Sequence, residues 1–349
     1  MSPRVKPPFR ADHVGSLIRP DALIRAREAA EKNEIAAEEL ARIQHEAIRA
    51  IVRLQEDIGF KLATDGEYNR IFWQRDFLVK FENVQQVAAK LTVRFHSAAG
   101  SRDHSPPTLE VSGKLNRPRA IFVDDFRFLA SVAHGTPKVT IPSPTTMHFR
   151  GGRDAIDRHA YPDIDEFYAD LARVYREEIA DLAAAGCRYL QIDEVNFAYL
   201  CDPALRAQVR NIGEEPQTLP KTYARLINQA IAGRPADMVV CLHLCRGNFA
   251  GAWVPRAATI RSPKFSSTTS PSMAISSNTI RRAPAALRRC DFCRRARSPC
   301  SASSPRRARS LKPRTNSSAG STKRAVTPRS NSLRFRRNAA SPAASAAMR

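Results

Sequence analysis

The chain has 349 residues and a formal net charge of +22, and residues 256–349 carry 22 of the 56 Lys and Arg but only one acid, so residues 1–255 are nearly neutral. No segment reaches the roughly 20 apolar residues of a membrane helix, and residues 1–10, an N-terminal extension, lack the apolar stretch of a signal peptide. The seven cysteines, without such a signal, indicate reduced thiols and a cytoplasmic protein.

The first predicted helix covers Glu38 to Ile58, where apolar residues recur at close to helical spacing. Gly59 follows as its expected C-terminal cap. Leu62 and Ala63 form a short apolar strand, and the polar sequence Thr64-Asp65-Gly66-Glu67 comes directly after it. This region therefore predicts a helix, a strand and a polar strand end in succession.

Residues 83–120 interrupt that order. Leu91 to Phe95 and Leu109 to Val111 alternate in polarity like strands, with Gly100 and Pro106-Pro107 between them. The pattern indicates a hairpin-like insertion.

The same helix–strand order returns twice. Asp163 or Asp165 can cap a helix that ends at Gly186, and a strand from Cys187 to Ile192 leads to Asp193-Glu194. A further strand, Met238 to Leu242, leads to His243 and Cys245. Polar residues thus follow each predicted strand.

Short apolar strands that alternate with helices predict a parallel sheet covered by helices. Polar residues at the carboxyl ends of the strands favour a (β/α)8 barrel of the TIM type over residues 11–255, because this fold builds its active sites there. A doubly wound open sheet is the alternative. The lack of a glycine-rich phosphate-binding turn after the first strand disfavours it.

The strongest local signal for chemistry is His243-Leu244-Cys245. Residues two apart in a strand face the same side, and zinc favours an imidazole together with a thiolate. Glu67, Asp193 and Ser16 follow other strands, so they are expected at the same end of the sheet. Taken singly, each acid is more often a helix cap or a solvated loop residue, and the His–Cys pair alone is a weak signal.

Five motifs together carry a family resemblance. In this order, they resemble the catalytic domain of cobalamin-independent methionine synthases, most closely the short single-domain relatives, over residues 8–255. The family's proteins are (β/α)8 barrels that bind zinc and transfer a methyl group to the thiol of homocysteine. The motifs are His13-Val14-Gly15-Ser16-Leu17-Ile18-Arg19-Pro20, Thr64-Asp65-Gly66-Glu67, Pro142-Ser143-Pro144-Thr145-Thr146-Met147, Gln191-Ile192-Asp193-Glu194 and His243-Leu244-Cys245.

The resemblance also implies roles for single residues. Ser16, Glu67 and Asp193 would contact the amino-acid part of homocysteine, with Asp193 as the catalytic carboxylate. His243 and Cys245 would bind zinc. Trp73 would line the methyl-donor side, although a core position fits this aromatic residue equally well. The donor is a methylated folate in the full-length relatives, and another carrier, such as a corrinoid protein, remains open.

The sequence departs from the family after Pro255, where the expected third and fourth zinc ligands, a glutamate and a second cysteine, are missing. Read one frame away, the codons of Met273 to Ile280 permit Gly-Tyr-Phe-Leu-Glu-Tyr-Asp, and those of Phe335 to Pro342 permit Ser-Pro-Gln-Cys-Gly-Phe-Ala. Both match the family. We therefore interpret residues 256–349 as translated out of frame, predict a disordered basic tail without helix or strand, and expect an incomplete barrel with impaired activity.

The sequence gives less support to two other functions. A barrel enzyme of the uroporphyrinogen decarboxylase type would not need His243 and Cys245. A basic protein that binds nucleic acid through residues 256–349 would be expected to place aromatic residues for stacking on bases. Phe265, Phe292 and Phe335 are too scattered for that, so we expect small-molecule substrates, with neither a specific nucleic acid nor a membrane as partner.

Overall fold

The computed structural model describes residues 6–97, 100–245, 247 and 273–276. They belong to one compact unit, Met1–Ser301. The expectations for residues 1–5 and for most of 256–349 lie outside the described residues. None of the described helices is long and apolar enough to cross a membrane.

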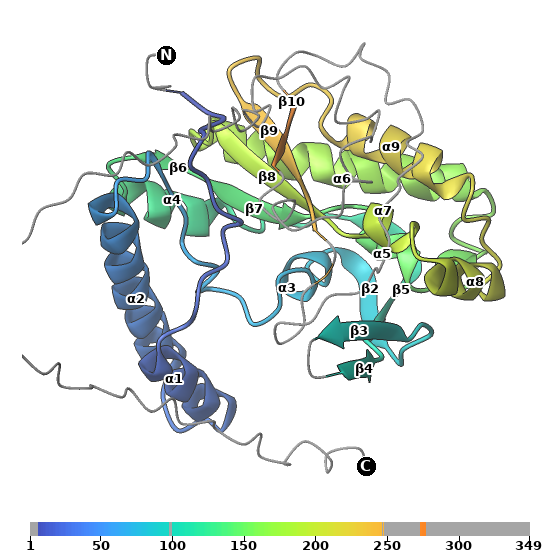
Figure 1. Ribbon diagram of the computed structural model, residues 1–349, viewed down its shortest axis with the longest axis horizontal. Helices are drawn as coiled ribbons and strands as arrows, with labels where there is room; N and C mark the ends of the chain where they lie inside the picture. Colours follow the sequence, from blue (N-terminus) through green and yellow to red (C-terminus); the bar gives the residue numbers. More distant parts are fainter. Residues whose placement is uncertain (1–5, 98–99, 246, 248–272, 277–349) are drawn as a thin grey trace, which may run out of the picture. The chain divides into compact units, whose positions relative to one another are not determined.

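Parallel strands form the centre of this unit (Figure 1). β7 (Val139–Pro142), β8 (Tyr189–Glu194), β9 (Val239–Leu244) and β10 (Met273–Ser276) make a four-stranded parallel sheet in chain order. β1 (Leu62–Ala63) pairs in parallel with β6 (Thr136–Pro137), and Lys138 alone separates β6 from β7. The order never reverses, unlike that of a doubly wound sheet. The described strands do not close into a ring, and the fold is mixed α/β.

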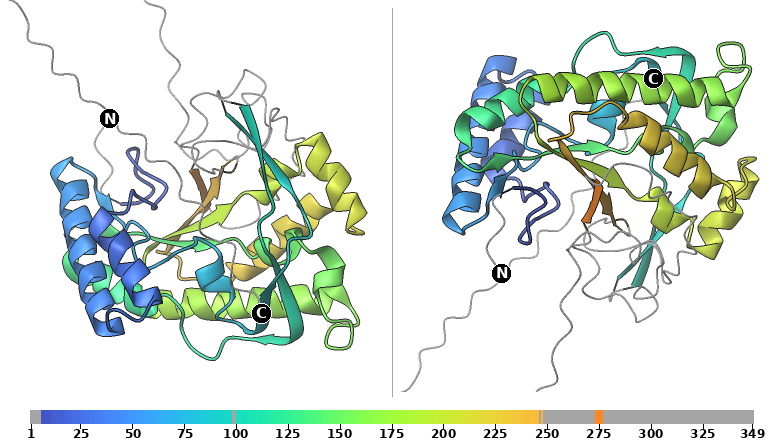
Figure 2. Two further views of the ribbon diagram at one scale, coloured as in Figure 1. Left: turned by 90° about the horizontal axis from the view of Figure 1, so that it is seen from below. Right: turned by 90° about the horizontal axis from the view of Figure 1, so that it is seen from above.

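Helices cover one face of this sheet. α6 (Ile164–Ala184) and α9 (Leu219–Ala230) pack against each other along it, as Figures 1 and 2 show. α6 begins at Asp163, whose side chain accepts a hydrogen bond from the backbone N–H of Asp165. The other helices are α1 (Asp21–Glu31), α2 (Ala37–Asp57), α3 (Arg75–Leu78), α4 (Val123–Val132), α5 (Thr146–Phe149), the 3-10 helix Gly152–Ala155, α7 (Asn196–Tyr199) and α8 (Pro203–Asn211).

Successive side chains along β8 and β9 face the hydrophobic core on one side of the sheet and the candidate site on the other. Leu190 and Ile192 of β8, with Val240 and Leu242 of β9, belong to the main hydrophobic core, which also contains the buried side chains of α6 and α9. Because successive residues of a strand face opposite sides, the odd-numbered residues of both strands point away from these helices. That second face carries the polar residues.

The predicted insertion holds two antiparallel pairs. β2 (Glu82–Val87) pairs with β5 (Thr108–Asn116), and β3 (Val93–Ser97) pairs with β4 (Gly100–His104). The two strands expected from the sequence are both present, but they lie in different pairs and are not the two arms of one hairpin.

Several predicted boundaries were wrong. β8 and β9 end two residues later than expected, so Asp193, Glu194 and His243 lie within strands and not after them. The absence of any strand after residue 256 was also wrong, because β10 pairs with β9 over Met273–Ser276. An exposed strand edge can pair with almost any sequence through backbone hydrogen bonds, so the side-chain pattern did not predict β10.

Candidate functional site

The register of the sheet places candidate residues side by side. Asp193 of β8 lies opposite His243 of β9, and Pro142 of β7 lies opposite Asp193. Two residues earlier on each strand, the equivalent row contains Thr140, Gln191 and Cys241. Partner residues on parallel strands face the same side. Asp193 and His243 therefore share one surface at the carboxyl ends of their strands.

Glu67 reaches the same surface from the turn after β1. It is buried and has a positive φ of 60°, and Asp65 accepts a hydrogen bond from its backbone N–H (2.9 Å). Its carboxylate accepts a hydrogen bond from the Thr140 hydroxyl (3.0 Å), and Thr140 in turn accepts one from Arg70 (2.9 Å). Thr140 thereby connects the turn after β1 to the row of polar residues on β7 and β8.

The segment that contains Ser16 crosses the same end of the sheet. Gly15 has a φ of +106°, and a Cβ there would lie 2.5 Å from the side chain of Thr140. Thr64 donates a hydrogen bond to the carbonyl of Gly15 (2.8 Å), and Leu17 donates one to the carbonyl of Gly66 (3.1 Å). Glycine is thus required for this close approach, which brings exposed Ser16 beside the Glu67 turn.

Two buried cations lie under these carboxylates. Burial would lower the pKa of Arg70, but the charges of nearby carboxylates, Glu67 first among them, raise it above its usual value. Lys138 donates hydrogen bonds to Asp12 (2.8 Å) and to the carbonyl of His13 (2.7 Å). The two cations offset part of the negative charge gathered at the site.

Asp193 is a carboxylate whose pKa this environment raises. Burial and the nearby charge of Glu67 raise its pKa to about 7, against the opposing effects of a Gln191 hydrogen bond (2.7 Å) and of nearby cations. A carboxylate whose ionisation is disfavoured by a neighbouring carboxylate makes a good site for a cation, because a bound ammonium group relieves the repulsion.

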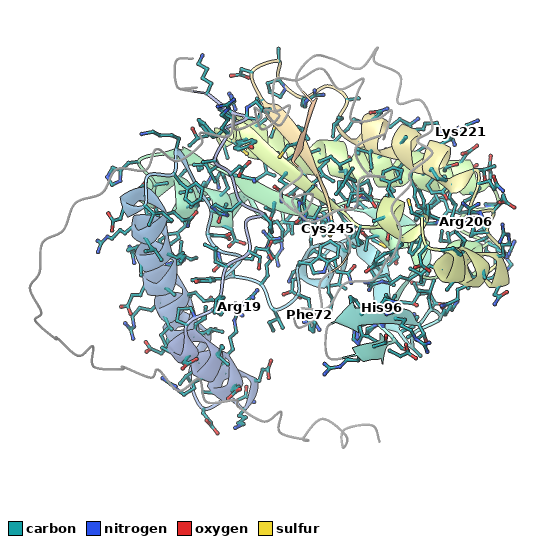
Figure 3. All side chains as sticks on the ribbon, in the orientation of Figure 1. Arg19, Phe72, His96, Arg206, Lys221 and Cys245 are labelled. Atoms are coloured by element: carbon teal, nitrogen blue, oxygen red, sulfur yellow. The ribbon has the colours of Figure 1, made fainter. Side chains whose placement is uncertain are left out.

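His243 and Cys245 combine nitrogen and sulfur donors at the end of β9. His243 is 5% exposed, and its Nδ1 has no hydrogen-bond partner among the described residues. Burial, with the charge of Lys138, lowers the pKa of His243 to about 4, so the imidazole is neutral at pH 7. Burial raises the pKa of half-buried Cys245 to about 11. Figure 3 shows Cys245 at this end of β9.

These two side chains suit zinc as donors, since zinc binds neutral imidazole and thiolate. The unpaired, buried Nδ1 of His243 is the observation that fits a metal, because a buried nitrogen without a partner is costly unless a ligand satisfies it. No group of three or more metal-binding side chains occurs in the described part of the chain. The described residues therefore fit half of a tetrahedral zinc site.

Glu194, next to Asp193, has a different environment. It is fully buried and accepts hydrogen bonds from the Thr145 hydroxyl (2.5 Å) and from the backbone N–H groups of Asn196 (2.5 Å) and Phe197 (3.2 Å). Thr145 also accepts one from the Asn196 amide (2.7 Å). This carboxylate joins the loop after β7 to α7 and has the bonding pattern of a structural residue.

Sequence reasoning placed some residues better than others. Glu67, Asp193 and His243 come together as described above, Cys245 follows at the end of β9, and Ser16 lies beside the Glu67 turn. Trp73 is half-buried and packs against the main core. The sequence analysis missed Arg70, Thr140 and Lys138. Thr140 and Lys138 alternate with apolar residues in β6–β7, a weak signal that these positions face the second side of the sheet.

Comparison with known proteins identifies the family of this chain. A model of the catalytic domain of the cobalamin-independent synthase matches residues 9–256. The chain belongs to the cobalamin-independent methionine synthase family. A crystal structure from Listeria monocytogenes, assigned as a vitamin-B12 independent methionine synthase, superposes with a TM-score of 0.58 and 32% identity, covering 81% of this chain and 85% of that one.

Other members of the cobalamin-independent methionine synthase family are similar in sequence. YxjH of Bacillus subtilis, named as an uncharacterized protein, is 38% identical over 249 residues, which are 71% of this chain and 64% of YxjH. A 5-methyltetrahydropteroyltriglutamate–homocysteine methyltransferase of Bradyrhizobium diazoefficiens is 30% identical over 190 residues, 54% of this chain and 23% of that enzyme. The chain thus spans about two thirds or less of the length of these relatives.

Proposed function

We propose that this protein derives from a zinc-dependent methyltransferase that transfers a methyl group from a methylated pteroylglutamate to the thiol of homocysteine. The observation that carries the proposal is the grouping of Glu67, Asp193 and His243 at one end of the sheet, with Cys245 two residues further on. Relatives named for this reaction support the choice of both substrates.

Homocysteine would be held by its amino-acid part. Its ammonium group would lie near Glu67 and Asp193 and would offset the effect of the Glu67 charge on Asp193. Exposed Ser16 lies beside the Glu67 turn and would contact the same part of the substrate. Binding would convert Asp193 fully to the carboxylate at neutral pH and release a proton wherever that group was still protonated.

His243 and Cys245 would hold zinc, together with the two further donors that a restored reading frame would supply. When bound, zinc lowers the pKa of a thiol, so that homocysteine would react as a thiolate at neutral pH. Buried His243 stays neutral and needs no deprotonation to act as a ligand.

The reaction itself would be a direct transfer. The thiolate sulfur forms a bond to the methyl carbon while the bond from that carbon to the ring nitrogen of the donor breaks. The nitrogen keeps the electron pair and takes up a proton, which balances the proton that the thiol lost. Asp193, at the carboxyl end of β8, would hold the substrate's amine so that its sulfur faces the donor.

We also propose that the complete fold is a (β/α)8 barrel. Parallel strands in unreversed order support this, as does the placement of the polar residues at the strands' carboxyl ends. Residues 1–10 would precede the barrel, residues 11–255 would form its first part, and residues 83–120 would be the insertion.

A reading-frame change after Pro255 would explain where the family resemblance stops. The family model matches up to residue 256, and the shifted codons described above would supply the missing glutamate and cysteine. In this proposal the chain as written has half of its zinc ligands, and its methyl transfer is impaired.

Homocysteine binding tests the proposal in the 349-residue chain. Titration calorimetry should show binding that falls at least tenfold in Glu67→Gln and in Asp193→Asn, because each removes a carboxylate from the ammonium site. Methyl transfer from 5-methyltetrahydropteroyltriglutamate should be weak in this chain and rise by orders of magnitude when the reading frame is restored.

Asp124→Asn is the matched control. Asp124 lies on α4 with its side chain 94% exposed and pairs only with Arg127 among the described residues, so this variant should bind homocysteine like the unmodified chain. Equal affinity in all four proteins, or a frame-restored chain that makes no methionine, would refute the proposed function.

A further inference from the structure

Arg150 is a cation without a carboxylate partner among the described residues. It is the C-terminal cap residue of α5, in the segment that follows β7, and its side chain is half-buried. It donates a hydrogen bond to the carbonyl of Pro107 (3.3 Å). With its amide oxygen turned toward the guanidinium, Gln74 accepts two more, at 2.6 and 3.2 Å. All of these acceptors are neutral.

Two other shielded arginines among the described residues lie beside carboxylates. Arg70 lies 3.9 Å from the carboxylate of Glu67, and Arg117 forms ion pairs with Glu178 (2.8 Å) and Asp181 (2.5 Å). An arginine remains charged in proteins even where burial lowers its pKa, as it does for Arg150. A desolvated cation with neutral partners is costly, and an anionic ligand would offset that cost.

The neighbours of Arg150 relate it to two parts of the proposed site. Gln74 directly follows Trp73 in the chain. Phe149 packs against Tyr199 at the end of α7, with ring centroids 5.8 Å apart. Burial raises the pKa of Tyr199, nearby Arg150 lowers it, and Cys245 lies close enough to raise it further. Arg150 thus lies near Tyr199, between the Trp73 segment and the end of β9.

In the proposed function, Glu67 and Asp193 bind the ammonium group of homocysteine, and neither carboxylate pairs with Arg150. We propose that Arg150 binds a carboxylate of the methyl donor's glutamate tail, so that this site selects an anionic donor over a cationic one. The inference rests on the proposed function for the identity of the donor. Guanidinium and carboxylate groups match in a bidentate geometry, which would also orient the donor.

The test uses p-aminobenzoyl-triglutamate, the anionic half of the donor, which has no methyl group to transfer. Titration calorimetry of the 349-residue chain should show binding that weakens about tenfold or more in Arg150→Gln. Arg150→Lys keeps the charge and should retain most of the affinity. Arg210→Gln, at an exposed position on α8, is the control and should bind as the unmodified chain does.

Homocysteine binding, measured in the same proteins, separates a local effect from misfolding. The inference predicts that Arg150→Gln leaves homocysteine affinity unchanged. It is overturned if Arg150→Gln binds the tail normally, if the unmodified chain does not bind it, or if homocysteine and tail affinities fall together. Intact tail binding in a frame-restored chain that transfers no methyl group would instead overturn the proposed function and leave the anion site standing.

Discussion

Asp193 and Glu194 are adjacent acids at the end of one strand, and their surroundings differ sharply. Glu194 is fully buried and receives hydrogen bonds from a hydroxyl and two backbone N–H groups. Asp193 receives one side-chain hydrogen bond and stands beside His243 with its unpaired Nδ1, and burial with the nearby charge of Glu67 raises its pKa to about 7.

The difference separates structural from functional polar groups. A buried group whose hydrogen bonds are complete stabilises the fold and has no capacity left for a ligand. The group around Asp193 retains unmet electrostatic and bonding capacity, which a substrate amine and a metal ion would use. Between these two adjacent acids, the completeness of hydrogen bonding, more than charge, separates the candidate site from the structural residue.

The largest effect is expected on zinc retention, which tests whether the site at His243 lacks two further zinc ligands. A frame-restored chain should retain one zinc ion per molecule through dialysis, and the 349-residue chain should lose it. Two donors in place of four should weaken zinc binding by about a thousandfold or more, because binding free energy grows with the number of ligands. Metal analysis after dialysis at pH 7.5 measures this, and equal zinc retention in both chains would contradict the reading-frame proposal.

Removing each acid in turn tests directly whether Glu194 and Asp193 differ in their contribution to stability. Glu194→Ala should lower the free energy of unfolding by about 3 kcal/mol, because buried donors from Thr145, Asn196 and Phe197 lose their acceptor. Asp193→Ala should change it by less than about 1 kcal/mol, since the carboxylate it removes accepts only one side-chain hydrogen bond. Urea unfolding measures both, and equal losses would show that the two acids are not different in kind.

Much of the site could be predicted from the sequence because it lies at strand ends. Short apolar runs followed by Glu67, Asp193 and His243 place these residues on one edge through geometry alone. The strand boundaries were less predictable, since β8 and β9 each extend by two residues into the polar motif, where pairing with the neighbouring strand overrides composition.

Residues whose contacts are distant in the chain could not be predicted from the local sequence pattern. Lys138 is fully buried and bonded to Asp12, more than a hundred residues away in the chain, and no local pattern predicts that pair. The four strands of the insertion could not be paired from sequence either, because their polarity alternates similarly and register depends on the turns between them. Arg150 was overlooked for the same reason, since its lack of a carboxylate is a property of the fold.

A smaller effect is expected at Thr140, which connects the Glu67 turn to the sheet. Thr140→Val keeps the shape of the side chain but removes the hydroxyl that donates to Glu67 and accepts from Arg70. The free energy of unfolding should fall by about 1–2 kcal/mol. Homocysteine affinity should fall several-fold, because Glu67 is no longer fixed opposite Asp193. Calorimetry with Thr140→Ser as the control, which retains the hydroxyl, measures the difference.

The smallest effect concerns Asp125, a second acid whose bonding is incomplete. Burial and the neighbouring charge of Asp65 raise its pKa to about 7, although Arg70 and a hydrogen bond from Asn69 (2.8 Å) oppose the rise. Its pKa in the unfolded chain is near 3.8, so the folded state holds the proton more tightly. Asp125 therefore lowers stability progressively as pH rises from about 4 to about 7.

Asp125→Asn removes this titration and keeps a side chain that can bond to Asn69. The variant should unfold at a temperature a few degrees higher than the unmodified chain at pH 8, a gain on the order of 1 kcal/mol, with the advantage shrinking toward pH 4. Asp124→Asn, at the exposed neighbouring position, should show no such pH dependence. A stability difference that stays constant between pH 4 and pH 8 would mean that Asp125 is satisfied in the folded state, as Glu194 is, and would place it with the structural acids.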